Sequence, residues 1–145
     1  MTDKRSDEAR LVFVSHSSED TWVARQIAGC ILEVGAKPFL DEAEIEVGAE
    51  FPEVIRRFLG EADELVVLFT PWAMERPWVW MEIGAAWLRQ IHIVVVLHGI
   101  SDGDFLANSK APGVLKQRNL IRLNDFDNYL EQLGRRAVVG SESNE

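Results

Sequence analysis

Residues 65–70 read L-V-V-L-F-T, five consecutive apolar side chains followed by a threonine. Residues 91–98 read I-H-I-V-V-V-L-H and form a second, largely apolar run that is rich in β-branched side chains. A strand with one face in water alternates apolar and polar residues, whereas a strand covered on both faces does not. The two runs therefore predict central strands of a parallel sheet that has helices on both of its faces.

Three further runs of strand type stand at residues 11–15, 37–40 and 120–123. The five runs are separated mostly by segments with helical spacing, and this alternation is typical of a parallel sheet. Right-handed crossovers leave few topologies for five parallel strands, and the order 2-1-3-4-5 is the commonest for a domain of this size. We therefore predict an α/β fold of the flavodoxin-like type, a three-layer sandwich around a five-stranded parallel sheet of order 2-1-3-4-5.

The first crossover is expected to be a helix. Apolar residues from Val23 to Val34 keep helical spacing, and Ser17 or Ser18 is placed to cap the helix start. Gly35 follows where a left-handed residue commonly ends a helix.

The remaining connections between the predicted strands differ in the structure that their sequences predict. Residues 51–59 have the apolar spacing of a helix, and a third helix is expected from Pro77 to about Gln90. Residues 101–118 contain glycine and proline and predict a short helix plus a loop, and the apolar spacing of residues 126–133 predicts a last helix.

Composition fits one domain. The chain has 145 residues, 47% of them hydrophobic and 27% charged, which suffices for a single core of ordinary size. We place the domain at residues 10–137 and expect disordered tails at residues 1–9 and 138–145. No apolar run reaches the roughly 18 residues of a membrane span, and the charged start lacks the apolar core of a signal peptide. A soluble, cytoplasmic protein with no membrane interaction is expected.

The net charge and the few cysteine and histidine residues argue against nucleic-acid binding and against a metal site. A net charge of -9 argues against binding of nucleic acid, which relies on Lys and Arg to neutralise phosphates. From Asp41 to Glu53 the chain is acidic without a basic residue, and such a run is either a solvated loop or a partner-binding segment. The single cysteine, Cys30, is expected to be a buried free thiol. The three histidines lack ligand spacing, so no metal site is expected.

The predicted topology focuses attention on two loops. Strand order reverses between the first and third strands, and ligands of open α/β sheets bind at the carboxyl ends of the strands at such a point. The loop over residues 15–20 offers Ser15 and His16 beside a helix start, and the loop over residues 70–78 leads to Glu82. Glu82 is the only ionisable residue in W-V-W-M-E-I-G-A-A-W-L, and a lone acid in an apolar helix usually has a partner or a function.

Two classes of protein share this sheet, but the residues of this chain do not match the motifs of either class. A phosphoacceptor receiver domain would carry an aspartate at the end of the third strand and a lysine after the fifth. Here the third strand ends at Phe69 and Thr70, and the fifth is followed by Asn124. A flavodoxin would need a Ser/Thr-rich phosphate loop after the first strand, which S-H-S-S only faintly suggests.

Four motifs in register resemble the Toll/interleukin-1 receptor (TIR) domain family, in its bacterial stand-alone form. They are V-F-V-S-H-S-S-E-D at residues 12–20, P-F-L-D at 38–41 followed by I-E-V-G at 45–48, E-L-V-V-L-F-T-P-W at 64–72, and W-V-W-M-E-I at 78–83. The last is similar to the family's Trp-Cys-x-x-Glu-Leu helix, with Val79 in place of the cysteine. The resemblance covers residues 10–137.

The resemblance implies an NAD+ nucleosidase that cleaves the nicotinamide-ribose bond to give ADP-ribose or a cyclic isomer, in antiphage immune signalling. NAD+ is then the substrate and no cofactor is needed. Glu82 matches the family's catalytic glutamate. Ser15 and His16 either hydrogen-bond the ligand or cap the helix, Trp78 either stacks on a ligand ring or caps the core, and Asp41 either contacts substrate or orders the acidic loop.

The implied partners are NAD+, other TIR domains in head-to-tail association, and an effector protein that senses the product. The acidic loop carries no base, so the pyrophosphate would rely on helix N-termini, on Arg76 or on a neighbouring subunit. Two alternatives stay open: a catalytically silent TIR interaction module, and an enzyme resembling nucleoside deoxyribosyltransferases.

Overall fold

The computed structural model of the chain describes residues 9–40, 59–107, 115 and 119–142. Five parallel strands form one sheet of order β2-β1-β3-β4-β5. The strands are β1 (Leu11–Ser15), β2 (Lys37–Leu40), β3 (Glu64–Phe69), β4 (His92–Leu97) and β5 (Leu120–Arg122). The predicted fold class and strand order are confirmed, since each strand coincides with a predicted run to within two residues at either end.

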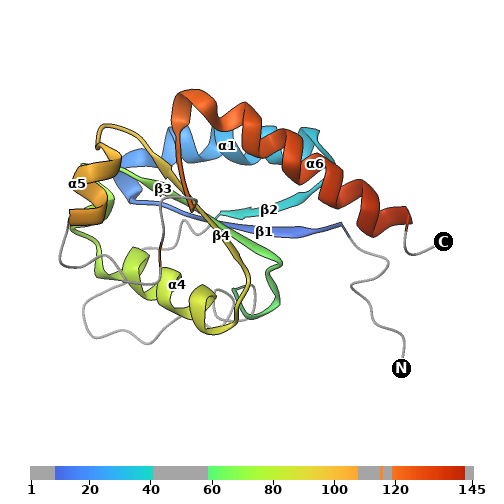
Figure 1. Cartoon of the computed structure of the whole chain (residues 1–145), viewed down its shortest axis with the longest axis horizontal. Coiled ribbons are helices and arrows are strands. Elements are labelled where there is room, and N and C mark those ends of the chain that lie inside the picture. The colour runs from blue at the N-terminus through green and yellow to red at the C-terminus, as the bar shows by residue number, and fades with distance from the viewer. Residues whose placement is uncertain (1–8, 41–58, 108–114, 116–118, 143–145) are drawn as a thin grey trace.

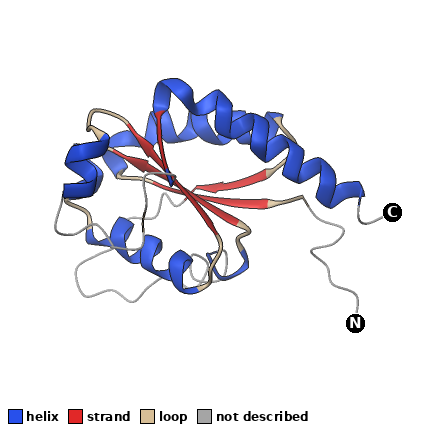
Figure 2. Ribbon diagram, viewed as in Figure 1, coloured by secondary structure: helices blue, strands red, loops and turns tan. Residues whose placement is uncertain are grey.

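Helices cover both faces of the sheet, so the molecule has three layers (Figures 1 and 2). One face carries α1 (Thr21–Glu33) and α6 (Phe126–Glu142), and the other carries α4 (Pro77–Leu88). Two short helices, α3 (Pro71–Met74) and α5 (Asp102–Ala107), and two 3₁₀ turns, η2 (Ser18–Asp20) and η4 (Leu123–Asp125), complete the described elements.

Burial of β3 explains the layers. All six of its residues are buried, and successive side chains of a strand point to opposite faces. Leu65 and Phe69 belong to the core beneath α4, together with Val79 and Ile83 of that helix. Val66 belongs to the second core, beneath α1 and α6. Each face of the strand therefore requires its own helical cover.

The helix ends largely follow local sequence. Gly35 adopts a φ of +96° after α1, as expected for a left-handed stop. Ser17 accepts a hydrogen bond from the Glu19 backbone and so caps η2, and the α-helix itself begins three residues after Ser18. The short helix predicted between residues 101 and 118 is α5, whereas α3 was not predicted.

One tail differs from the sequence expectation. Helix α6 extends to Glu142, so residues 138–142, which the sequence assigned to a disordered tail, are helical. The physical reason is that this stretch contains no proline, and Gly140 costs an existing helix only about 1 kcal/mol. The predicted helix over residues 51–59 and the acidic run from Asp41 lie almost wholly outside the described residues.

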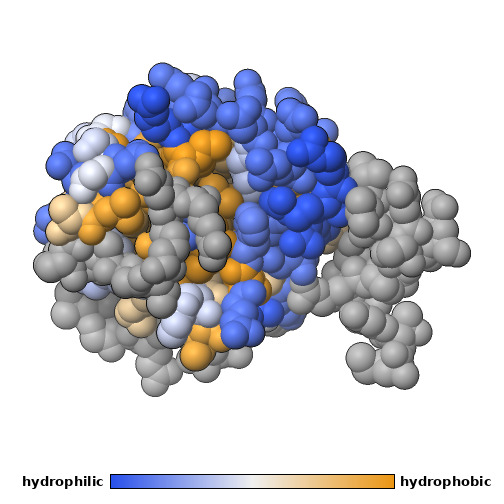
Figure 3. Space-filling model, in the orientation of Figure 1, coloured by the Kyte–Doolittle hydropathy of each residue, from blue (hydrophilic) through white to orange (hydrophobic). Residues whose placement is uncertain are grey.

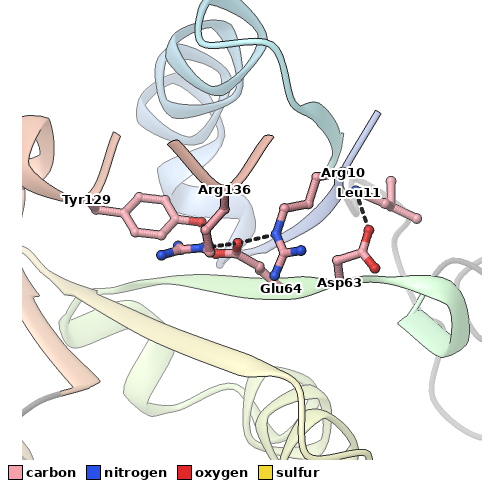
Figure 4. Close-up of polar contacts among 6 residues, drawn as sticks. All are labelled: Arg10, Leu11, Asp63, Glu64, Tyr129 and Arg136. Atoms are coloured by element: carbon pink, nitrogen blue, oxygen red, sulfur yellow. Dashed lines mark hydrogen bonds and ion pairs between the residues drawn. The ribbon is translucent and has the colours of Figure 1, made fainter. Parts of the chain in front are cut away.

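A buried carboxylate network ties the amino-terminal end of the sheet to α6 (Figure 4). Glu64, with 0% of its side chain exposed, accepts hydrogen bonds from Arg10 Nε at 2.5 Å and from Arg136 Nε and Nη2 at 2.7 and 2.8 Å. The Tyr129 hydroxyl donates to Glu64 at 2.8 Å, and the Leu11 amide donates to Asp63 at 2.8 Å. The start of β3 is thereby joined to β1 and to the last helix.

The network sets the protonation of its members. Burial alone would raise the pKa of Glu64, but the hydrogen bonds from Arg136, Arg10 and Tyr129 outweigh burial and hold the pKa below its ordinary value. Burial and the negative charge of Glu64 raise the pKa of Tyr129. Glu64 is therefore ionised and Tyr129 is neutral at neutral pH.

Glu64 is expected to make the fold sensitive to acid. Its lowered pKa contributes stability that is present above the ordinary value of 4.5 and is lost as the pH falls through the folded-state value. Glu64→Gln should lower the free energy of unfolding at pH 7 by about 3 kcal/mol, because two arginines lose a buried partner, and it should also remove part of the acid dependence. Urea unfolding between neutral and acidic pH measures both effects.

The matched control is Glu131→Gln, since Glu131 also pairs with an arginine but is 71% exposed. Exposed pairs contribute about 0–1 kcal/mol, so this variant should behave as wild type. Equal losses in the two variants would contradict the role given to Glu64.

Candidate functional site

The candidate site lies where the strand order reverses, at the carboxyl ends of β1 and β3. These strands are paired in parallel, with Ser15 opposite Val67, while the crossover from β1 leads to the other side, to β2. Loops that leave adjacent strands toward opposite faces diverge, and the divergence opens a crevice. The residues that follow each strand therefore meet at one edge of the sheet.

Two local signals fix the position of α4. Thr70 caps α3, with its Oγ1 accepting from the Ala73 amide at 3.2 Å, and Pro71 occupies the first turn. Arg76 then adopts an extended conformation, and Pro77 starts α4. The Trp80 indole donates to the Met74 carbonyl at 3.0 Å, which holds the two helices together.

Glu82 lies on the buried side of α4, together with Val79, Ile83 and Ala86. It is 1% exposed, and its Oε1 accepts a hydrogen bond of 2.5 Å from Ser15 Oγ. Ser15 is itself fully buried at the end of β1. Sequence reasoning placed Glu82 beside the mouth of the sheet, but the structure buries it more deeply, directly against the first strand.

The other predicted residues divide into two groups. His16 is 9% exposed and follows Ser15 directly, and Trp78 is half-buried one helical turn before Glu82. His16 is therefore adjacent to Ser15 along the chain, and Trp78 is one turn from Glu82 along α4. Asp41 lies outside the described residues.

A second buried contact crosses the same edge of the sheet and was not predicted. Thr70 Oγ1 donates to Asp20 Oδ2 at 2.6 Å, and the two residues are 1% and 7% exposed. Thr70 follows β3 and Asp20 precedes α1, so the contact joins the two loops that form the crevice. The only sequence signal was the position of each residue at the end of a predicted strand or the start of a predicted helix.

Arg76, at the start of α4, forms an ion pair at the surface near the site. Arg76 Nη2 lies 3.9 Å from Glu19 Oε1, and both side chains are about half exposed. Such a pair contributes about 0–1 kcal/mol, so Arg76 can exchange Glu19 for another anion at little cost. Arg89 lies away from the site, at the C-terminal end of α4, where one of its nitrogens donates to the carbonyls of Leu59 and Ala62, each at 2.9 Å, before the start of β3.

The chemical feature of this arrangement is a buried carboxyl group that a hydroxyl orients. Within the described part of the chain, no group of three or more His, Cys, Asp or Glu side chains could hold a metal ion. None of the helices described is long and apolar enough to cross a membrane. A carboxyl group that a hydroxyl holds in one orientation is pre-organised to stabilise a cationic transition state.

Comparison with known proteins assigns the fold independently. A family model described as "TIR domain" matches residues 12–136. Among the solved structures that match is one described as "Structure of the activated Roq1 resistosome directly recognizing the pathogen effector XopQ (TIR domains)". The similarity has a TM-score of 0.58 at 17% sequence identity, and it covers 92% of this chain and 84% of that one. No curated protein matches the sequence.

The contact between Thr70 and Asp20 is expected to stabilise the edge of the sheet. Thr70→Val keeps the side-chain shape but removes both the donor to a buried carboxyl group and the acceptor that caps α3, which should lower the free energy of unfolding by about 1–3 kcal/mol. Thr70→Ser retains the hydroxyl and should recover most of the loss. Chemical denaturation of the three proteins measures the difference, and a Thr70→Val variant as stable as wild type would contradict the assignment.

Proposed function

Because the chain belongs to the TIR domain family, we propose that it is an NAD+ nucleosidase that cleaves the bond between nicotinamide and ribose. The observation that carries this proposal is the hydrogen bond of 2.5 Å between Ser15 and Glu82 at the point where the strand order reverses. Glu82 is the glutamate of W-V-W-M-E-I, the motif that resembles the family's catalytic helix. NAD+ is the substrate in this proposal, and no cofactor takes part.

The chemistry needs one carboxylate. Nicotinamide in NAD+ is a cationic pyridinium, so when its bond to ribose C1′ breaks the electron pair moves to the ring nitrogen and a neutral molecule leaves. No general acid is required, in contrast with the paired carboxylates of ordinary glycosidases. The ribose becomes oxocarbenium-like, and the Glu82 carboxylate stabilises the positive charge.

The neighbouring side chains have separate roles in this proposal. Ser15 is a positioning residue, because its hydroxyl donates to one carboxyl oxygen and fixes the orientation of the group. Trp78 and His16 contact the substrate rings and hydroxyls, since each lies close along the chain to one residue of this hydrogen bond. Arg76, half exposed beside the start of α4, binds the pyrophosphate after releasing Glu19.

The second step determines the product. Water that attacks C1′ gives linear ADP-ribose and releases a proton, whereas attack by a nucleophile within ADP-ribose itself gives a cyclic isomer. Either product would act as a signal in immune defence if an effector protein binds it. The family assignment supports this role.

Self-association belongs to the same proposal. The Roq1 structure that matches this chain contains TIR domains within a resistosome, so this fold is found in at least one multi-chain assembly. We infer that copies of this chain associate head to tail, and that activity increases with assembly.

A catalytically silent TIR interaction module is the second candidate, and one observation favours it. Glu82 is only 1% exposed, so a substrate would reach it only after the loops at the crevice move. In this alternative the contact with Ser15 serves packing alone.

Incubation of the purified chain with NAD+, followed by chromatography for nicotinamide and for linear and cyclic ADP-ribose, distinguishes the two candidates. Wild type should release nicotinamide, and Glu82→Gln should reduce the rate at least about a hundredfold, because the charge is lost while the shape is kept. Glu33→Gln, at an exposed position on α1, is the matched control and should be as active as wild type. No nicotinamide from a concentrated wild-type sample would leave the silent module as the function.

Ser15→Ala tests the positioning role separately. Loss of the hydroxyl leaves the Glu82 charge in place but removes the donor that orients it, so kcat should fall about tenfold or more while KM changes little. Steady-state kinetics at several NAD+ concentrations measures both constants. A rise in KM with unchanged kcat would instead make Ser15 a substrate-binding residue.

A further inference from the structure

Asp20 is a buried carboxylate that the reaction proposed above does not use. It stands at the start of α1, where aspartate commonly caps a helix, yet its side chain makes no capping hydrogen bond. The carboxylate is turned instead toward the end of β3, where Thr70 Oγ1 donates to its Oδ2 at 2.6 Å. A residue of a type that stabilises helix starts is thus directed at the edge of the sheet where ligands bind.

One oxygen of this carboxylate is left for another donor. Within the described residues, the hydrogen bond from Thr70 is the only one to the Asp20 side chain, although the residue is 7% exposed. The other oxygen, Oδ1, does not belong to the buried side-chain atoms that lack a partner, so it reaches solvent. A carboxylate accepts hydrogen bonds at both of its oxygens. Asp20 therefore presents an oriented acceptor to a ligand that enters the crevice.

Asp20 lies further out along this edge than Glu82. Thr70 directly follows β3, three residues beyond Val67, which is paired with Ser15. Strand residues rise about 3.3 Å each and Thr70 has extended backbone angles, so it lies roughly 10 Å beyond Ser15. Ser15 holds Glu82, and Thr70 holds Asp20. The two carboxyl groups therefore face different parts of an extended ligand.

In the proposed function, the pyrophosphate binds next to Asp20. The Arg76 guanidinium lies 3.9 Å from the carboxylate of Glu19, the residue before Asp20, so it adjoins the start of α1. The pyrophosphate of NAD+ joins two riboses, and Glu82 acts on the ribose that bears nicotinamide. The ribose beside Asp20 is then the other one, in the adenosine half of the substrate.

The surface at this edge of the sheet suits a nucleoside. Figure 3 shows apolar residues around α5, whereas the outer side of α6 is hydrophilic. Leu106 on α5 is 41% exposed, and Trp72 on α3 is 55% exposed. A purine has apolar faces on which an indole stacks, and its ribose carries hydroxyl donors. Exposed apolar side chains and an oriented carboxylate offer contacts to both parts.

We propose that Asp20 accepts a hydrogen bond from the 2′-hydroxyl of the adenosine ribose and thereby selects NAD+ over NADP+. Acidic side chains bind this hydroxyl in other dinucleotide-binding sheets. NADP+ has a phosphate in its place, which removes the donor and brings negative charge against the carboxylate. Thr70 is the positioning residue, because its hydroxyl fixes the orientation of Asp20. This role of Asp20 rests on the proposed function, since it needs a dinucleotide in the crevice.

Asp20→Asn is the test variant, and Asp104→Asn is the matched control. Asparagine keeps an oxygen that accepts from Thr70 and removes only the charge, so this variant should fold like wild type, which urea unfolding checks. Asp104 is exposed on α5, which follows the carboxyl end of β4. Both variants lose one negative charge at the same edge of the sheet, so a difference between them belongs to Asp20.

Isothermal titration calorimetry with ADP-ribose and with 2′-phospho-ADP-ribose measures this recognition without any cleavage. Wild type and Asp104→Asn should bind ADP-ribose at least about a hundredfold more tightly than its 2′-phosphate. Asp20→Asn should reduce this preference at least about tenfold, because the repelling charge is gone. The ratio of kcat/KM for NAD+ and NADP+ should change in parallel, while kcat for NAD+ changes little.

Three results would overturn the role of Asp20. Equal affinity of wild type for the two ligands is one, and it would leave the proposed cleavage of NAD+ unaffected. Binding of neither ligand is another. The third is an unchanged preference in Asp20→Asn, which would make the contact with Thr70 structural only. A preference that Asp20→Asn reduces, in a chain that releases no nicotinamide, would support the recognition site and count against the proposed reaction alone.

Discussion

Every side chain of β3 is buried, so the sheet around it needs a helical layer on each face. Leu65 and Phe69 pack beneath α4, and Val66 packs beneath α1 and α6. Burial on both sides leaves the polar backbone groups of the strand no partner except neighbouring strands, which places β3 in the middle of the sheet, between β1 and β4. In the observed order β1 lies between β2 and β3, so the strand order reverses between β1 and β3, and this reversal creates the crevice.

Buried carboxyl groups lie at both ends of the sheet, but their hydrogen-bond donors differ between the two ends. At the amino-terminal end, two arginines bind Glu64, so its charge is neutralised and serves the fold. At the carboxyl end, the hydroxyls of Ser15 and Thr70 donate to the carboxyl groups of Glu82 and Asp20. A hydroxyl orients a carboxyl group without cancelling its charge. In the proposed function, the carboxyl end is therefore the one that meets the cationic ligand.

Local patterns in the sequence predicted the elements, the strand order and the position of Glu82 near the switch point. Continuous apolar runs predict covered strands, and a lone acid within an apolar helix is conspicuous. The pairings between distant segments could not be predicted, because Arg10 and Arg136 are 54 and 72 residues from Glu64, and Asp20 is 50 from Thr70. Such contacts depend on how strands and helices align in three dimensions. Helix α3 was missed because four residues give no periodic signal.

The position of a single ionisable residue makes the two sides of α4 different. The helix has one ionisable residue, and the fold uses it inward, against Ser15, so the outward side is left without charge. A helix of twelve residues is marginal by itself, and its stability comes from what its faces contact. The inward face supplies that stability, because Val79, Ile83 and Ala86 are buried in the core beneath the helix. The same packing holds the backbone that carries Glu82 against Ser15, so the geometry of the candidate site depends on the core beneath α4.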